Sequence, residues 1–143
     1  MRLPITDIRK HISEALRLGG GLSPEIGSIK LVERRNRERD AEFGIQCLTY
    51  LFEHDRYAAF REVGDAFLSC EGHHEVEQPQ VGDLAIYLVE IGGDREQTHI
   101  GRIKSPGRVL SKWGYGHVYE HTLDEVPVEY GEHVRFFRPN ALS

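Results

Sequence analysis

At residues 84–91 the chain reads LAIYLVEI, a nearly continuous apolar run that decides the fold. A short apolar run of this kind is typical of a β-strand that is buried on both faces. The preceding Val81-Gly82-Asp83 predicts a turn into the strand, and Gly92-Gly93-Asp94 predicts a hairpin connection out of it. We therefore expect a β-sheet at the centre of the protein.

The rest of the C-terminal half also has the pattern of strands joined by short turns. Because neighbouring strands with short connections pair side by side, this pattern favours an antiparallel meander. Residues 123–131 carry no evident chemistry and are expected only to connect two strands. The further extended segments are predicted at residues 98–104, 108–113, 115–123 and 133–138.

The N-terminal half has helical periodicity instead. Residues 4–18 place Ile5, Ile8, Ile12 and Leu16 on one face, which predicts an amphipathic helix. Residues 33–40 mix both charge signs and are expected to form a solvated helix face or loop. The remaining predictions are helices at 41–53 and 57–63 and a polar loop at 69–80.

Composition and length set the class of protein. A chain of 143 residues with 39% hydrophobic and 29% charged residues fits one globular domain, residues 1–143. Helices followed by strands indicate an α+β fold, with N-terminal helices packed on one side of a C-terminal antiparallel β-sheet. The net charge of −5 does not indicate a nucleic-acid partner, and no apolar run is long enough to cross a membrane.

Two further features concern the cellular setting. The amino terminus lacks the apolar core of a secretion signal, so we expect a cytoplasmic protein. Only Cys47 and Cys70 are present, and in a reducing compartment both should be free thiols. The sequence does not specify an oligomeric state.

One cysteine and one histidine are candidates for nucleophilic chemistry. Cys47 falls in the first turn or so of the helix predicted at 41–53, where the helix dipole stabilises a thiolate. His99 shares one strand face with Gly101 and Ile103, and the glycine leaves space beside the imidazole. Taken singly, each residue has a structural interpretation, since cysteine is often buried and a strand histidine often belongs to a core. Their combination and their order in the chain favour the functional interpretation over the structural one.

This order resembles that of the papain-like NlpC-type cysteine peptidases and amidases. The resemblance rests on a cysteine at a helix start, then Gln80-Val81-Gly82-Asp83-Leu84-Ala85-Ile86-Tyr87, then His99-Ile100-Gly101-Arg102-Ile103. It implies a papain-like catalytic core at residues 41–138, preceded by an N-terminal helical extension at residues 1–40. It also implies a cysteine hydrolase that needs no cofactor and acts on a peptide, a protein or another acyl substrate.

The resemblance assigns roles position by position. Cys47 resembles the nucleophile and His99 the base that takes its proton. The family's third polar residue, which orients the imidazole, falls near Ser111 on the next strand, with His117 as a substitute. Gln46 is a possible oxyanion donor beside the backbone N–H of Cys47.

Two alternatives stay open at this point. The same fold could serve as a catalytically inactive protein-binding module, for which the serine at position 111 is the sequence hint. A metal-binding protein could use Cys70, His73 and His74, whose thiolate and imidazole groups are typical zinc ligands. The pair His117 and His121 has the four-residue spacing of ligands on a helix, but its glycine-rich context predicts an extended chain.

Overall fold

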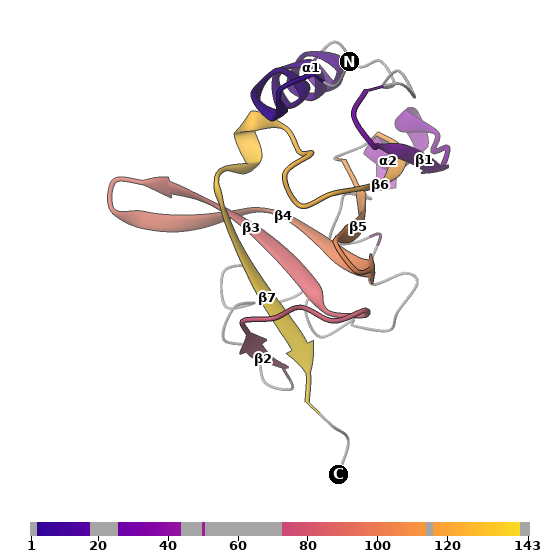
Figure 1. Ribbon diagram of the computed structural model, residues 1–143. Helices are drawn as coiled ribbons and strands as arrows, with labels where there is room; N and C mark the ends of the chain where they lie inside the picture. Colours follow the sequence, from indigo (N-terminus) through magenta and orange to yellow (C-terminus); the bar gives the residue numbers. More distant parts are fainter. Residues whose placement is uncertain (1–2, 18–25, 44–49, 51–72, 114–115, 141–143) are drawn as a thin grey trace.

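The computed structural model describes residues 3–17, 26–43, 50, 73–113 and 116–140 (Figure 1). Within these residues, seven strands form one antiparallel sheet, accompanied by two α-helices and a short 3-10 helix. The helices are α1 (Ile5–Arg17), α2 (Arg37–Phe43) and η3 (Val128–Tyr130). The strands are β1 (Lys30–Glu33), β2 (His73–Val76), β3 (Leu84–Ile91), β4 (Asp94–Ser105), β5 (Arg108–Lys112), β6 (Val118–His121) and β7 (His133–Pro139).

The predicted meander is confirmed. The strand order is β1-β6-β5-β4-β3-β7-β2, so β3, β4, β5 and β6 lie side by side in chain order. Residues 84–88 of β3 are buried on both faces, as the apolar run predicts. Gly92 and Gly93 close the hairpin between β3 and β4, and the far end of this hairpin projects from the body of the protein (Figure 1).

The closing strand β7 is also confirmed, but it does not extend the meander. It lies on the other side of β3, where Tyr87 pairs with Val134, and it also pairs with β2. The polar loop predicted at residues 69–80 is therefore wrong for residues 73–76. This short segment is a strand because β7 supplies its backbone partners, a long-range cause that its polar sequence does not reveal.

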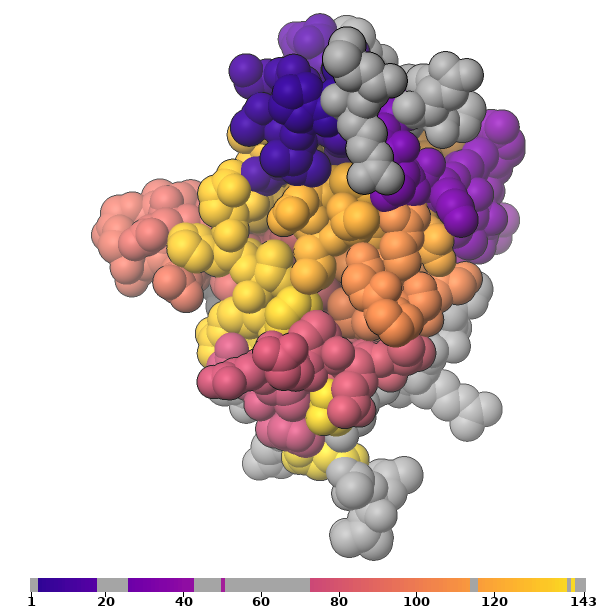
Figure 2. Space-filling view, in the orientation of Figure 1, coloured from indigo at the N-terminus to yellow at the C-terminus, as the bar shows by residue number. Residues whose placement is uncertain are grey.

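Helix α1 confirms the N-terminal prediction to within one residue at each end. Ile8 and Ile12 are buried, and they belong to a core cluster with Ile29, Trp113 and Tyr119. Ile5 is instead 40% exposed. In the space-filling view α1 lies against the C-terminal part of the chain that includes η3 (Figure 2).

The predicted order of helices first and sheet second is wrong in one respect. Strand β1 lies inside the stretch expected to be a helical extension, yet it pairs with β6 at the edge of the sheet. The boundary expected at residue 40 therefore divides residues that share one sheet. Strand β1 has only four residues and no strong turn signals beside it, so the local sequence does not indicate this pairing.

The sheet has two faces, which we name after His99 and Lys112. Cross-strand pairs show that Tyr87, His99 and Val109 share the His99 face, and Ser111 joins them because its Cβ closely approaches Gly101. Lys112, next to Ser111 in β5, points from the opposite face.

The described helices contact both faces, which corrects the expectation of helices on one side only. Helix α1 packs with Trp113 and Tyr119 on the His99 face. Helix α2 instead contributes Asp40, whose carboxylate binds Lys112. The chain is thus a mixed structure built on a seven-stranded antiparallel sheet.

Candidate active site

His99 lies in the middle of β4, opposite Tyr87 of β3, and is only 3% exposed. Its ring stacks on Tyr130 with centroids 4.2 Å apart and 14° between the planes, and it lies 5.6 Å from the ring of Tyr87. Neither ring nitrogen has a hydrogen-bond partner among the described residues. Burial lowers the pKa of His99 well below its ordinary value, and the nearby His121 lowers it further, so the imidazole is neutral near pH 7.

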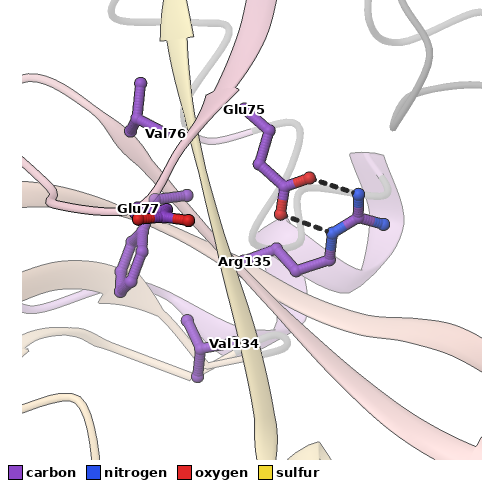
Figure 3. Close-up of a pocket in the computed structure, with 6 residues that line it drawn as sticks. Glu75, Val76, Glu77, Val134 and Arg135 are labelled. Carbon is purple, nitrogen blue, oxygen red and sulfur yellow. Dashed lines mark hydrogen bonds and ion pairs between the residues drawn. The ribbon is translucent and has the colours of Figure 1, made fainter.

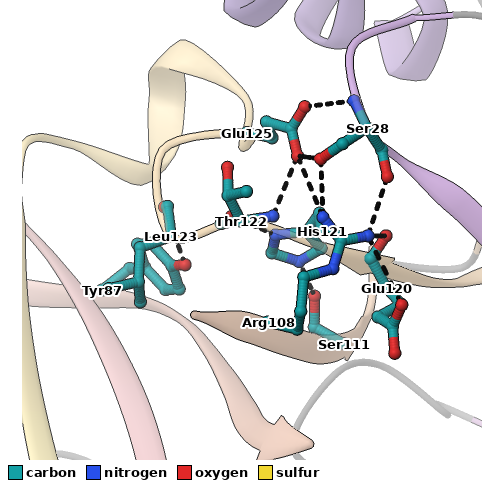
Figure 4. Close-up of polar contacts among 9 residues, drawn as sticks. All are labelled: Ser28, Tyr87, Arg108, Ser111, Glu120, His121, Thr122, Leu123 and Glu125. Carbon is teal, nitrogen blue, oxygen red and sulfur yellow. Dashed lines mark hydrogen bonds and ion pairs between the residues drawn. The ribbon is translucent and has the colours of Figure 1, made fainter. Parts of the chain in front are cut away.

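The predicted third residue, Ser111, is hydrogen bonded to a different histidine (Figure 4). Its Oγ lies 2.7 Å from Nε2 of His121 and accepts a bond from the indole N–H of Trp113 at 3.1 Å. Nδ1 of His121 lies 2.7 Å from the carbonyl oxygen of Thr122, an acceptor only. Nδ1 must therefore carry the proton, and Ser111 donates to Nε2. Within the described part of the chain, no hydrogen bond joins Ser111 to His99.

A buried carboxylate holds the turn that follows His121. Glu125 accepts bonds from the backbone N–H and hydroxyl of Ser28, both at 2.6 Å, and from the N–H of Thr122 at 2.9 Å. Arg108 donates to the hydroxyl and carbonyl of Ser28 (Figure 4). Burial favours a higher pKa for Glu125, but the bonds from Ser28 and Thr122 outweigh it and lower the pKa. The carboxylate is thus ionised and ties residue 28 to the turn after β6.

His117, the predicted substitute for Ser111, also has another partner. Its Nδ1 accepts a hydrogen bond from the backbone N–H of Arg35 at 2.8 Å. Burial and the positive charges of Arg34 and Lys112 lower its pKa. Since Nδ1 accepts this bond, the neutral ring carries its proton on Nε2. No contact between His117 and His99 occurs among the residues described.

Cys47 and Gln46 lie outside the described residues, but described residues on both sides of them in the chain have clear contacts. Asp40 of α2 binds Lys112 at 3.0 Å, and the hydroxyl of Tyr50 donates to Glu33 at 3.1 Å. Lys112 points away from the His99 face. Bringing Cys47 to His99 therefore depends on residues 44–49, which connect α2 to Tyr50.

The segment expected to be a solvated face contains a buried charge network instead. Asp40 is 1% exposed and receives two bonds from Arg35, at 2.9 and 3.0 Å, besides the contact with Lys112. Lys112 is fully buried. Burial favours a higher pKa for Asp40, but the bonds from Arg35 and Lys112 outweigh it and lower the pKa. The prediction of a solvated face is wrong for Arg35 and Asp40. The buried cation that pairs with Asp40 is Lys112, which belongs to β5 and is distant in the sequence.

The metal alternative is weakened by the geometry of β2. His73 and His74 are consecutive strand residues, so their side chains point to opposite faces. Nδ1 of His74 lies 2.6 Å from the side-chain oxygen of Asn140, and Cys70 lies outside the described residues. In the described residues, no group of three His, Cys, Asp or Glu side chains could hold a metal ion.

An open hollow of about 500 Å³ is lined by residues of the paired strands β2 and β7 and by Glu77, which follows β2. Glu75 and Arg135 form a two-pronged ion pair there, at 2.5 and 2.8 Å (Figure 3). Of the predicted site residues that the structure describes, His99, Ser111 and His117, none lines this hollow. Its lining residues are Glu75, Val76, Glu77, Val134, Arg135 and Phe136.

Sequence reasoning missed the role of residues 122–132, of which residues 123–131 were expected only to connect two strands. We call them the covering segment because they place Tyr130 on His99 and Val126 on the core of the His99 face. Arg9 of α1 holds this segment by donating to the carbonyls of Val126, Pro127 and Gly131, and it also pairs with Glu132. The only feature of the sequence that points to this role is an aromatic residue, Tyr130, directly before a glycine, Gly131.

Gly131 is the most constrained point of the covering segment, and Gly131→Ala should destabilise the protein by about 2 kcal/mol or more. Its φ of +90° suits glycine alone, and an added Cβ would lie 2.2 Å from the carbonyl oxygen of Leu88. Gly92→Ala is the matched control, because Gly92 has a φ of +59° with open space around it. Urea unfolding should show the larger loss at Gly131, and equal losses would contradict the close packing described.

Comparisons with known proteins found no matching family model, no similar curated protein and no similar solved structure. Within the described residues, none of the helices has the length and apolar character needed to span a membrane.

Proposed function

We propose that this protein is a cysteine hydrolase that cleaves an amide or related acyl bond, with Cys47 as nucleophile and His99 as base. The observation that carries the proposal is the state of His99, a buried neutral imidazole whose two nitrogens have no described partner. Buried polar groups are rarely left unsatisfied, and those that are need an explanation. A cysteine thiol at His99 would supply one. The proposal includes a papain-like arrangement of residues 41–138.

In this mechanism the thiol proton of Cys47 moves to a ring nitrogen of His99, and the thiolate attacks the substrate carbonyl. The imidazolium then protonates the leaving amine or thiol as the acyl–sulfur bond forms and the original bond breaks. Water, activated by the neutral imidazole, hydrolyses the acyl-enzyme. Backbone N–H groups near Cys47, with Gln46 as a further donor, would stabilise the oxyanion.

The low pKa of His99 is compatible with this role. Burial disfavours an isolated imidazolium, but a thiolate formed beside it supplies an opposite charge that favours the protonated ring. Proton transfer would thus create an ion pair instead of a lone buried cation. A peptide, a protein or another acyl compound is the proposed substrate.

The test is the pH dependence of cysteine alkylation. Iodoacetamide at pH 7 should modify Cys47 at least about tenfold faster than Cys70, because a partner base raises the thiolate fraction. The Cys47 rate should also reach its half-maximum at a lower pH, a readout that does not depend on accessibility. His99→Ala should abolish both differences, whereas His117→Ala, a histidine with another partner, should keep them. Identical pH profiles for the two cysteines in the wild-type protein would refute the hydrolase proposal.

An inactive binding module is the second candidate, and the hydrogen bonds of Ser111 favour it. The serine hydroxyl is engaged by His121 and Trp113, so it does not act as the family's orienting residue for His99. The same alkylation experiment separates the two candidates. Activation of Cys47 supports the enzyme, and its absence supports the binding module.

A further inference from the structure

His99 is oriented in the structure by aromatic rings. The Tyr130 ring lies nearly parallel to the imidazole, with 4.2 Å between centroids, and Tyr87 contacts the same imidazole in a tilted geometry. Stacking fixes the plane of an imidazole without occupying either nitrogen. In this arrangement both buried nitrogens are without a hydrogen-bond partner among the described residues.

Tyr130 is itself held from three directions. Its carbonyl accepts a bond from the hydroxyl of Thr98 at 2.8 Å, and its N–H donates to Pro127 at 3.1 Å. Arg9 reaches the carbonyls on both sides of it, at Pro127 and Gly131. Because these hydrogen bonds fix the backbone of Tyr130, its ring has a fixed position against the imidazole.

We infer that Tyr130 is the positioning residue for His99, taking by ring stacking the place that a hydrogen-bonding side chain would fill. The inference rests on the proposed function, in which His99 serves Cys47. With Tyr130 in this role, Ser111 is not needed to orient His99 and can be hydrogen bonded to His121. Tyr130 would act through His99 and would not contact the substrate.

The experiment compares Tyr130→Leu, which removes the ring, with Tyr130→Phe, which keeps it. Tyr130→Leu should slow Cys47 alkylation at pH 7 by roughly tenfold, since a misplaced base loses its alignment with the thiol. Tyr130→Phe should restore the wild-type rate and pH profile. NMR should also find the His99 ring protons shifted upfield by the stacked ring in the wild-type and Phe proteins, and the shift lost in the Leu protein.

Two controls separate positioning from loosening of the fold. Val118→Ala removes a fully buried side chain that pairs with Lys112 on the opposite face of the sheet, so it should lower stability without changing the pH profile of Cys47. If Tyr130→Leu does not fold, Thr98→Val tests the same point, because it removes the hydroxyl that holds the carbonyl of Tyr130. Thr98→Val should then slow alkylation.

The outcomes distinguish this inference from the function beneath it. A folded Tyr130→Leu protein with the wild-type pH profile of Cys47 would overturn the positioning role and leave the hydrolase proposal intact. A wild-type protein in which Cys47 is no more reactive than Cys70 would overturn both.

Discussion

Asp40→Ala should destabilise the protein by about 3 to 5 kcal/mol, as expected when a buried ion pair loses one partner. The carboxylate is shared by Arg35 and by Lys112, whose side chain is fully buried. Removing it leaves the ammonium group of Lys112 facing an alanine in place of its counter-charge. Urea unfolding at pH 7 measures the loss.

A second substitution tests whether the buried charge is the cause. Lys112→Met alone should be destabilising, because it removes one cation from an ionised carboxylate. In the Asp40→Ala background the same change should be stabilising, because it removes the cation that lost its counter-charge. If Lys112→Met has the same effect in both backgrounds, the network does not control stability.

The control is an exposed ion pair on α1. Glu14 contacts Arg17 at 3.0 Å, and both side chains are more than half exposed. Glu14→Ala should therefore change the free energy of unfolding by at most about 0.5 kcal/mol. A loss at Asp40 no larger than the loss at Glu14 would contradict the burial of this network.

The parts of the fold that sequence could predict are those with a local cause. The apolar run at 84–91 and the glycines at 92 and 93 identify a strand and its turn from neighbouring residues alone. Strands β1 and β2 could not be predicted in this way. Each has four residues and depends on backbone partners in β6 and β7, which are distant in sequence.

The same distinction applies to the candidate site. The place of His99 on a strand face could be predicted, because strand alternation and the nearby Gly101 are local signals. The stacking of Tyr130 on His99 depends on how residues 122–132 cross the sheet, and the bond from Ser111 to His121 depends on the pairing of β5 with β6. Burial of Lys112 could not be predicted, because its counter-charge comes from α2.

The stability of the protein should fall by about 2 kcal/mol between pH 7 and pH 4.5 through His121 alone. Burial lowers the pKa of His121 to about 4, although the bond to the Thr122 carbonyl opposes this effect. The unfolded chain has the ordinary value of about 6.5 and therefore binds more protons below that pH. The stabilisation is complete above pH 6.5 and is lost as the pH falls toward 4.

His121→Gln isolates this contribution, because glutamine can accept the bond from Ser111 and does not titrate. The variant should be less stable than the wild-type protein at pH 7, and the difference should shrink by about 2 kcal/mol at pH 4.5. His99 has a lowered pKa as well and changes stability in the same direction in both proteins; burial, the larger cause of that lowering, is common to both, whereas the smaller effect of His121 is removed with the variant and adds to the difference.

The buried carboxylates Asp40 and Glu125 do not produce the same pH dependence of stability. Asp40 and Glu125 have lowered pKa values, so their stabilisation is present at higher pH and is lost only as the pH falls below their ordinary values near 4. Most of their effect therefore comes below the range in which His121 titrates, and both proteins share it. Wild-type and His121→Gln curves that run parallel from pH 7 to 4.5 would show that His121 is not held as a neutral ring. Converging curves would identify the buried neutral ring of His121 as the group that makes this core sensitive to acid.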